Sequence, residues 1–258
     1  MIEMQTIITR RKAVLDTMKE QGIRQLLVTD PASVYYLTGH YEEPMERFWA
    51  LYLHESGLVK VAANRLFTLP EISEEEIVWH ADGESGVETL IPYIEKTEVL
   101  YVDGSMKARF LLACMENGAA AGFRDGSEVM KQVRACKDSD EQAKMLEASK
   151  INDLAMEKFK ALIRPGVTER QVAEQMLTIY RSLGAQDYSF EPLVAFGANA
   201  ACGHHGPDDT VLKEGDCVLL DVGCKKDGYC SDMTRTFFFG EPDGESRKVY
   251  FCLILLML

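Results

Sequence analysis

Two aspartates on either side of a predicted turn are the residues of this chain best suited to chemistry. Residues 217–239, CVLLDVGCKKDGYCSDMTRTFFF, contain an apolar run, a polar turn and a second β-rich run, which predicts a hairpin. A loop symmetric about Lys226 and Asp227 places Asp221 directly opposite Asp232. Directly opposed residues have Cβ atoms about 5 Å apart, where two carboxylates repel each other. The hairpin therefore needs something that offsets the two charges.

Three arrangements can accommodate two opposed carboxylates: a shared proton, a basic partner or a bound cation. Arg235 is a candidate partner, but it lies an odd number of positions from Asp232, so strand alternation predicts that it points to the other face. Three apolar residues precede Asp221, so we expect that side chain to be buried, where an unpaired carboxylate favours its protonated form. A cation suits both charges, and oxygen ligands favour Mn²⁺, Mg²⁺ or Ca²⁺, with Co²⁺ or Zn²⁺ if a His joins them. The alternative is a pair of solvated surface acids.

The cysteines offer a second candidate metal site, which their spacing does not support. Four of them lie close to His204 and His205, but none of the seven cysteines forms a CxxC pair. The pattern fits a reducing compartment, in which Cys serves as a small buried hydrophobe.

Composition excludes one large class of partner. With 258 residues and 47% hydrophobic content, the chain can bury a sizeable core, and its length favours two domains. Its formal net charge of -13 would repel the phosphate backbone of a nucleic acid. We therefore expect no nucleic-acid partner. Charges spread through residues 1–22 argue against a secretory signal, so we expect a cytoplasmic protein with no membrane attachment.

The first half of the chain alternates between predicted helices and short strands. An amphipathic helix is expected over residues 6–21, ended by Gly22. Strands follow at residues 24–30, 48–55, 58–63 and 98–104, with a helix at 106–118. This pattern predicts an α/β (α+β) domain with a mixed sheet over residues 1–134.

Longer helices begin after the proposed boundary and open a second domain over residues 135–258. Ser139 and Gln142 have the spacing of a capping box, and so do Thr168 and Gln171. The first helix should run to about residue 162 before Pro165, and the second should end at Gly184.

Several of these segments resemble the pita-bread metallopeptidases. The spacing Asp221-x10-Asp232-x-Thr234 resembles their central signature, FEPLVAFGANAACGHH resembles the segment that carries a substrate-side His, and VRACKDSDEQAKMLEASKIND resembles the first helix of their catalytic domain. VYYLTGHY resembles a creatinase-type N-terminal domain, which methionine aminopeptidases generally lack. Residues from about 9 to 242 therefore resemble the aminopeptidase P / Xaa-Pro dipeptidase (prolidase) group.

The resemblance implies roles for individual residues. Asp221 would bind one metal and Asp232 would bridge two, and His204 would be the catalytic residue that approaches the substrate. Thr234 and His205 are candidates for contacts with the substrate or around the ligands, although Thr234 could be a packing residue and His205 a surface residue. The family site implies two divalent ions, Mn²⁺ first and Co²⁺ or Zn²⁺ as alternatives, which activate a water to hydrolyse bonds next to proline. Proline-containing peptides would be the partners, and a homodimer is expected of an intact protein.

The end of the chain departs from the family pattern. In the family a further His and two Glu complete the site from sequence well beyond the hairpin, whereas here a helix expected from about Ser246 runs into FCLILLML. We therefore expect a C-terminally truncated catalytic domain, an incomplete metal site and little activity. The alternatives are a non-catalytic pita-bread binding module and a creatinase-like hydrolase without metal, and the presence of both aspartates argues against each.

Overall fold

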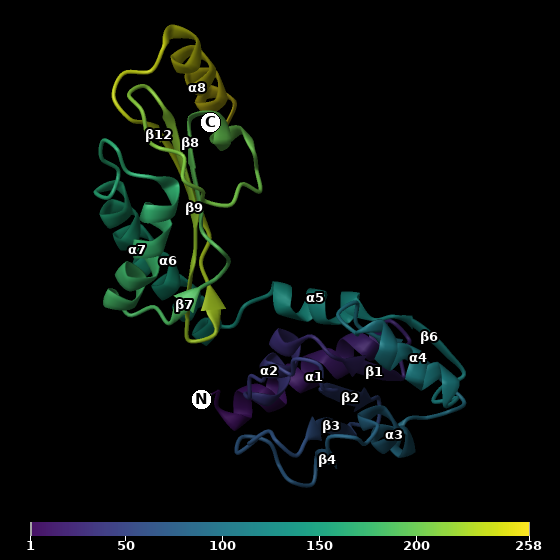
Figure 1. The fold of residues 1–258 in the computed structure, drawn as a ribbon. Helices are drawn as coiled ribbons and strands as arrows, with labels where there is room; N and C mark the ends of the chain where they lie inside the picture. The colour runs from purple at the N-terminus through teal and green to yellow at the C-terminus, as the bar shows by residue number, and fades with distance from the viewer. Residues whose placement is uncertain (1, 258) are drawn as a thin grey trace. The chain divides into compact units, whose positions relative to one another are not determined.

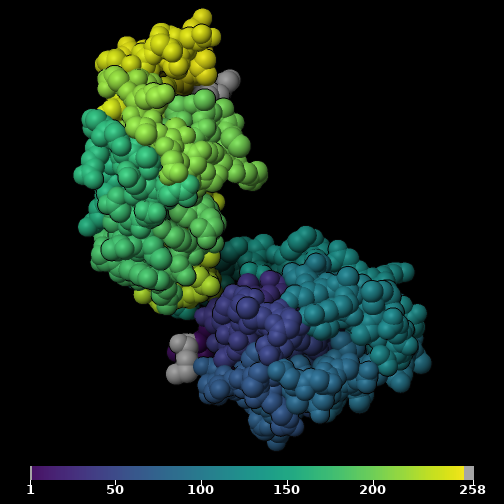
Figure 2. Space-filling model, viewed as in Figure 1, coloured from purple at the N-terminus to yellow at the C-terminus, as the bar shows by residue number. Residues whose placement is uncertain are grey.

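The chain folds into two compact units, which we describe separately. Unit 1 comprises Met1–Cys136 and unit 2 comprises Lys137–Leu258 (Figure 1). The computed structural model describes residues 2–257, and their side chains as far as Cys252. In the space-filling view the side chains of each unit form a closely packed body (Figure 2).

Unit 1 is built on a six-stranded mixed sheet in the order β4-β3-β2-β1-β5-β6. Its strands are β1 (Gln25–Val28), β2 (Ala50–His54), β3 (Val59–Asn64), β4 (Ile77–His80), β5 (Val99–Val102) and β6 (Gly122–Asp125). The pairs β1–β2 and β2–β3 are antiparallel, and β1–β5, β5–β6 and β3–β4 are parallel. The mixed sheet is confirmed, and so are the strands expected at residues 48–55 and 58–63, which pair as β2 and β3.

Helices cover both faces of this sheet, which explains why β1 is buried throughout. They are α1 (Met4–Glu20), α2 (Pro31–Thr38), α3 (Gly86–Leu90), the 3₁₀ turn η1 (Ile91–Tyr93), α4 (Ala108–Glu116) and α5 (Ser127–Ala135). Leu26 and Val28 pack with residues of α1, α2 and α5, whereas Leu27 packs with residues of α3 and α4. A strand buried on both faces lacks polar alternation, as QLLV does.

Unit 2 packs two helices against one face of short antiparallel strands (Figure 1). The helices are α6 (Ser139–Lys160) and α7 (Glu169–Ser182). One sheet has the order β12-β9-β8, with β8 (Leu193–Phe196), β9 (Cys217–Val222) and β12 (Met233–Phe238). The other has the order β11-β10-β7, with β7 (Asp187–Tyr188), β10 (Cys224–Lys226) and β11 (Tyr229–Cys230). The 3₁₀ turn η2 (Gly197–Ala201) follows β8.

The last element is α8 (Gly244–Met257), which confirms the helix expected from about Ser246. No helix within the described residues combines the length and the apolar character that crossing a membrane requires.

The start of α6 corrects one sequence prediction. The capping box is formed by Asp138 and Glu141, one residue before the predicted pair of Ser139 and Gln142. Asp138 accepts from the Glu141 N–H at 2.9 Å, and the Glu141 carboxylate accepts from the Asp138 N–H at 2.9 Å. Asp and Ser are about equally good N-caps, so spacing alone could not choose between them. The predicted box of Thr168 and Gln171 is confirmed at the start of α7.

The hairpin turn also lies one residue beyond its predicted position. Its central residues are Asp227 and Gly228, with φ of 49° and 83°. Lys226 pairs with Tyr229, which makes this a two-residue turn. Two successive positive φ angles define the type I′ turn, which favours Asp-Gly because Gly has no side chain to oppose that conformation. The prediction centred on Lys226 and Asp227 was therefore wrong.

Candidate active site

Asp221 lies on the face of β9 that points away from α6 and α7. Val218, Leu220 and Val222 are fully buried in the core under these helices, whereas the residues between them, Asp221 included, are half-buried. The prediction that Asp221 is buried is therefore wrong, because side chains alternate along a strand and the apolar neighbours of Asp221 bury only the opposite face.

The observed register places Thr234, and not Asp232, directly opposite Asp221. The shifted turn is the cause, because moving its centre by one residue moves every partner by two. Asp232 lies just before β12, two positions before Thr234, and it is exposed between the more buried Ser231 and Met233, so alternation assigns it to the same face as Asp221, in a diagonal position. Diagonal neighbours on paired strands are typically about 7–8 Å apart. The two aspartates thus share a face without being directly opposed.

The side chain of Thr234 is joined to the first aspartate. Its hydroxyl donates a hydrogen bond of 2.8 Å to Asp221 Oδ1, which fixes one carboxylate oxygen and leaves Oδ2 available. Arg235 pairs with Leu220 and therefore lies on the other face, as predicted. Its guanidinium donates to the Thr234 carbonyl at 2.9 Å. Within residues 2–257 neither Asp221 nor Asp232 forms an ion pair, so their charges have no protein counter-ion.

The two histidines lie in the loop that follows η2 and differ in their surroundings. His204 is exposed, and no described residue forms a hydrogen bond or an ion pair with its ring. His205 has a side-chain exposure of 14%, and its Nε2 lies 2.6 Å from Oε2 of Glu169. No hydrogen bond or ion pair among the described residues links either histidine to Asp221 or Asp232.

Glu169 is the residue that sequence reasoning missed. It is the first residue of α7, it is 0% exposed, and it forms with His205 and Asp208 a group whose possible metal-binding atoms lie within 4.8 Å of one another. No local pattern could have revealed it, because its carboxylate partners lie 27 to 39 positions away in the sequence.

The surroundings of Glu169 do not suit a metal ion. A carboxylate can accept about four hydrogen bonds, and this one already faces four donors. Oε1 accepts from Phe196 N at 2.7 Å and Asn199 Nδ2 at 3.0 Å, and Oε2 accepts from Asp208 N at 3.1 Å and His205 Nε2 at 2.6 Å. An ion would have to displace donors that a buried carboxylate needs.

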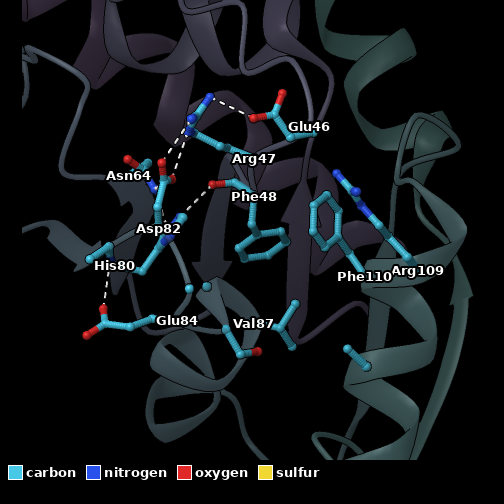
Figure 3. A pocket seen from close by; sticks show the side chains of 15 residues that line it. Glu46, Arg47, Phe48, Asn64, His80, Asp82, Glu84, Val87, Arg109 and Phe110 are labelled. Carbon is cyan, nitrogen blue, oxygen red and sulfur yellow. Dashed lines mark hydrogen bonds and ion pairs between the residues drawn. The ribbon is translucent and has the colours of Figure 1, made fainter.

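Unit 1 contains a surface pocket of about 330 Å³ that is unrelated to these residues (Figure 3). Phe48 and Phe110 form its apolar side, with ring centroids 4.9 Å apart. On the polar side Arg47 binds Asp82 through two hydrogen bonds of 3.0 and 3.1 Å, which lower the pKa of the Asp82 carboxyl below its ordinary value. Because these charges already neutralise each other, we assign this network a structural role.

Family models match both units. The creatinase/prolidase N-terminal domain matches residues 10–136, and metallopeptidase family M24 matches residues 143–255. An uncharacterised peptidase of Staphylococcus aureus (strain bovine RF122 / ET3-1) is 30% identical over 257 residues, which cover 94% of this chain and 70% of the relative.

Solved structures agree in fold. A prolidase from Thermococcus sibiricus is 31% identical with a TM-score of 0.88, and the match covers 96% of this chain and 70% of that one. A dipeptidase from Pyrococcus horikoshii OT3 is 30% identical with a TM-score of 0.85, covering 93% and 68%. The creatinase-like N-terminal domain and the pita-bread fold expected from the sequence are thereby confirmed. The chain belongs to metallopeptidase family M24, in the group with a creatinase/prolidase N-terminal domain.

Proposed function

We propose that this chain belongs to an exopeptidase that hydrolyses peptide bonds next to proline with two divalent metal ions, Mn²⁺ first among them. The substrate class is supported by the structural neighbours described as prolidase and dipeptidase at 31% and 30% identity. Turnover of an Xaa-Pro dipeptide compared with turnover of a longer peptide would distinguish a dipeptidase from an aminopeptidase.

The observation that carries this proposal is the pair of carboxylates without a counter-ion. Asp221 and Asp232 share one face of the hairpin, and neither is paired with a positive side chain among the described residues. In a diagonal position, about 7–8 Å apart, the two carboxylates repel each other less than directly opposed residues do, and a cation between them would offset the repulsion that remains. Carboxylate oxygens are the ligands that Mn²⁺ and Mg²⁺ prefer, so the chemistry of these residues fits the proposed ions.

The chain's own residues would act on the metal ligands and on the substrate. Asp221 would hold one of the ions and Asp232 would be shared by the two. Thr234 donates a hydrogen bond to Asp221 Oδ1 and so fixes the orientation of a carboxylate whose Oδ2 would remain free to bind. His204, exposed and without a protein partner among the described residues, is assigned to the substrate. Bound divalent ions supply Lewis-acid chemistry that lowers the pKa of a water and polarises the scissile carbonyl.

Ligand number limits how tightly the 258-residue chain can hold these ions. Within the described residues, the group of three nearby potential ligands contains neither Asp221 nor Asp232. Two carboxylates bind a divalent ion weakly, so we expect this polypeptide to turn over Xaa-Pro peptides slowly or not at all. A rate typical of enzymes, on the order of 10 s⁻¹, measured with added Mn²⁺ would contradict this expectation.

The metal assignment is tested by binding measurements on matched variants. Asp221→Asn and Asp232→Asn each remove one ligand charge, so we expect each to weaken Mn²⁺ binding more than tenfold, followed by electron paramagnetic resonance of free Mn²⁺. Thr234→Val removes the donor to Asp221, with an expected loss of about tenfold. Asp227→Asn is the control, because it makes the same change in the same hairpin and Asn-Gly also suits the turn. Equal affinity in all variants would refute the assignment.

Location and assembly remain part of the proposal. All seven cysteines are free, which supports a reducing compartment such as the cytoplasm. We also propose a homodimer for the intact protein, which sedimentation equilibrium would test.

A further inference from the structure

Glu169 is a buried carboxylate that an unrelated segment of the chain surrounds with donors. Full burial of a carboxylate is costly unless hydrogen bonds replace its hydration. Here two donors are backbone N–H groups and two are side chains, at 2.6 to 3.1 Å. Because the carboxylate accepts from His205, we place the ring hydrogen on Nε2.

These donors come from the continuous stretch between β8 and the strands of the hairpin. Phe196 ends β8, Asn199 lies in η2, and His205 and Asp208 lie in the loop that follows. The Glu169 side chain at the start of α7 thus accepts hydrogen bonds from β8, from η2 and from the loop that follows η2.

Further hydrogen bonds close the far end of the same loop on α7. The Glu169 N–H donates to the Thr210 carbonyl at 3.2 Å, and the Arg170 N–H donates to the Asp208 carbonyl at 3.0 Å. Asn199 Nδ2 donates to Thr210 Oγ1 at 3.1 Å. Hydrogen bonds from Thr210 lower the pKa of Asp208 below its ordinary value, which keeps that acid an acceptor within the loop.

We propose that Glu169 is a positioning residue for His204. His204 directly precedes His205, so the bond that holds the His205 ring to Glu169 also fixes the backbone from which His204 extends into solvent. His205 is then the link in this tether and not a substrate ligand. This inference rests on the proposed function, because it concerns the residue assigned there to the substrate.

The proposal is tested in the full chain without metal or peptide. Amide hydrogen exchange reports the freedom of residues 196–210, and the nuclear magnetic resonance signals of the His204 ring report its surroundings. His205→Leu removes the donor at similar size, and we expect exchange across residues 202–210 to rise about tenfold with a shift or broadening of the His204 signals. His205→Gln restores an N–H near the position of Nε2 and should return both readings toward the wild type.

Glu169→Gln supplies a second test, because its amide group must face at least one of the four donors. The backbone amide that faces the Gln NH2 group, that of Asp208 or that of Phe196, should then lose about tenfold of its protection. Glu174→Gln, the same change at an exposed position of α7, is the control and should alter neither reading. If Glu169→Gln fails to fold, the two His205 variants still decide.

Two results would overturn the proposal. The first is a His205→Leu variant whose amide exchange or His204 signals match those of the control. It would show that the hydrogen bond between His205 and Glu169 does not position His204. A His205→Gln variant as loose as His205→Leu would show that the donated hydrogen bond is not the cause. Because neither reading needs a metal ion, a failure of the metal assignment at Asp221 and Asp232 would be seen separately.

Discussion

At the scale of single residues, the hairpin depends on a position with no side chain. A Cβ added to Gly223 would lie 2.1 Å from the Ser231 carbonyl oxygen and 2.0 Å from Ser189 Oγ, far inside van der Waals contact. Ser189 Oγ donates to that same carbonyl at 2.8 Å. Gly223 therefore lets the Ser231 backbone approach closely just after β9 ends at Val222 and just before β12 begins at Met233.

Gly223→Ala should consequently destabilise unit 2. Backbone and a short hydroxyl side chain must move to admit the methyl group, so we expect the free energy of unfolding to fall by about 1–3 kcal/mol. Urea unfolding of the full chain measures this change. Gly206→Ala is the control, since nothing lies within 4 Å of the added Cβ and its φ is ordinary. Equal losses in both variants would contradict the packing argument.

At this scale the sequence predicts candidate ligands but not their contacts. Asp221, Asp232 and Thr234 are candidates because spacing along a hairpin is a local property, and alternation assigns them to one face. The predicted pairing is wrong by two positions, because the Asp-Gly preference of a type I′ turn centres the turn one residue later. Glu169 was out of reach, because its donors are distant in the sequence and burial of a single charge leaves no pattern.

At the scale of elements, two buried hydrogen bonds connect helices α6 and α7 of unit 2 to strand β9. The Tyr180 hydroxyl on α7 donates to Asn152 Oδ1 on α6 at 2.5 Å, and Asn152 Nδ2 donates to the Val222 carbonyl on β9 at 3.2 Å. Tyr180 and Asn152 are both fully buried, and burial raises the pKa of the Tyr180 hydroxyl. That hydroxyl therefore stays protonated and remains a donor at every ordinary pH.

Tyr180→Phe should destabilise the protein beyond the loss of one hydrogen bond. It leaves Asn152 Oδ1 buried without its donor, at a cost of about 1–3 kcal/mol. Thermal unfolding followed by circular dichroism measures it. Tyr93→Phe serves as the control, because Tyr93 is 38% exposed. A change no larger than that of the control would show that water satisfies Asn152.

Elements were predictable where short-range chemistry sets their limits. The strand pair β2–β3, the capped start of α7 and the helix ended before Gly184 all follow from local signals. The first residue of α6 was missed because Asp138 and Ser139 are both good caps, and only the tertiary position of the chain selects one.

At the scale of the whole molecule, the seven free cysteines differ in exposure, so their reactivity shows which parts of each unit are buried. Cys136, Cys202, Cys230 and Cys252 are exposed, whereas Cys114 and Cys224 are buried and Cys217 is half-buried. Burial raises the pKa of Cys114 to about 11 and also raises the pKa values of Cys217 and Cys224. Only the thiolate reacts with alkylating reagents.

Alkylation of the native protein near pH 8 should therefore modify the four exposed cysteines well before the other three. A raised pKa leaves a thiol protonated until the pH approaches that value, so the reaction of Cys114 should accelerate only toward pH 11. Mass spectrometry of peptides gives the order of modification, and the urea-unfolded chain is the control, in which all seven should react alike. Early modification of Cys114 or Cys224 would contradict the packing described for their unit.

The length of the two-residue turn at Asp227 and Gly228 determines whether Asp221 and Asp232 lie on the same face of the hairpin. Side chains change face at every residue, so a single insertion between Asp221 and Asp232 would send one of them into the core under the helices, while two insertions would leave both on the same side. A length change of two residues in this turn therefore keeps both carboxylates on one face, whereas a change of one residue does so only where a β-bulge absorbs it.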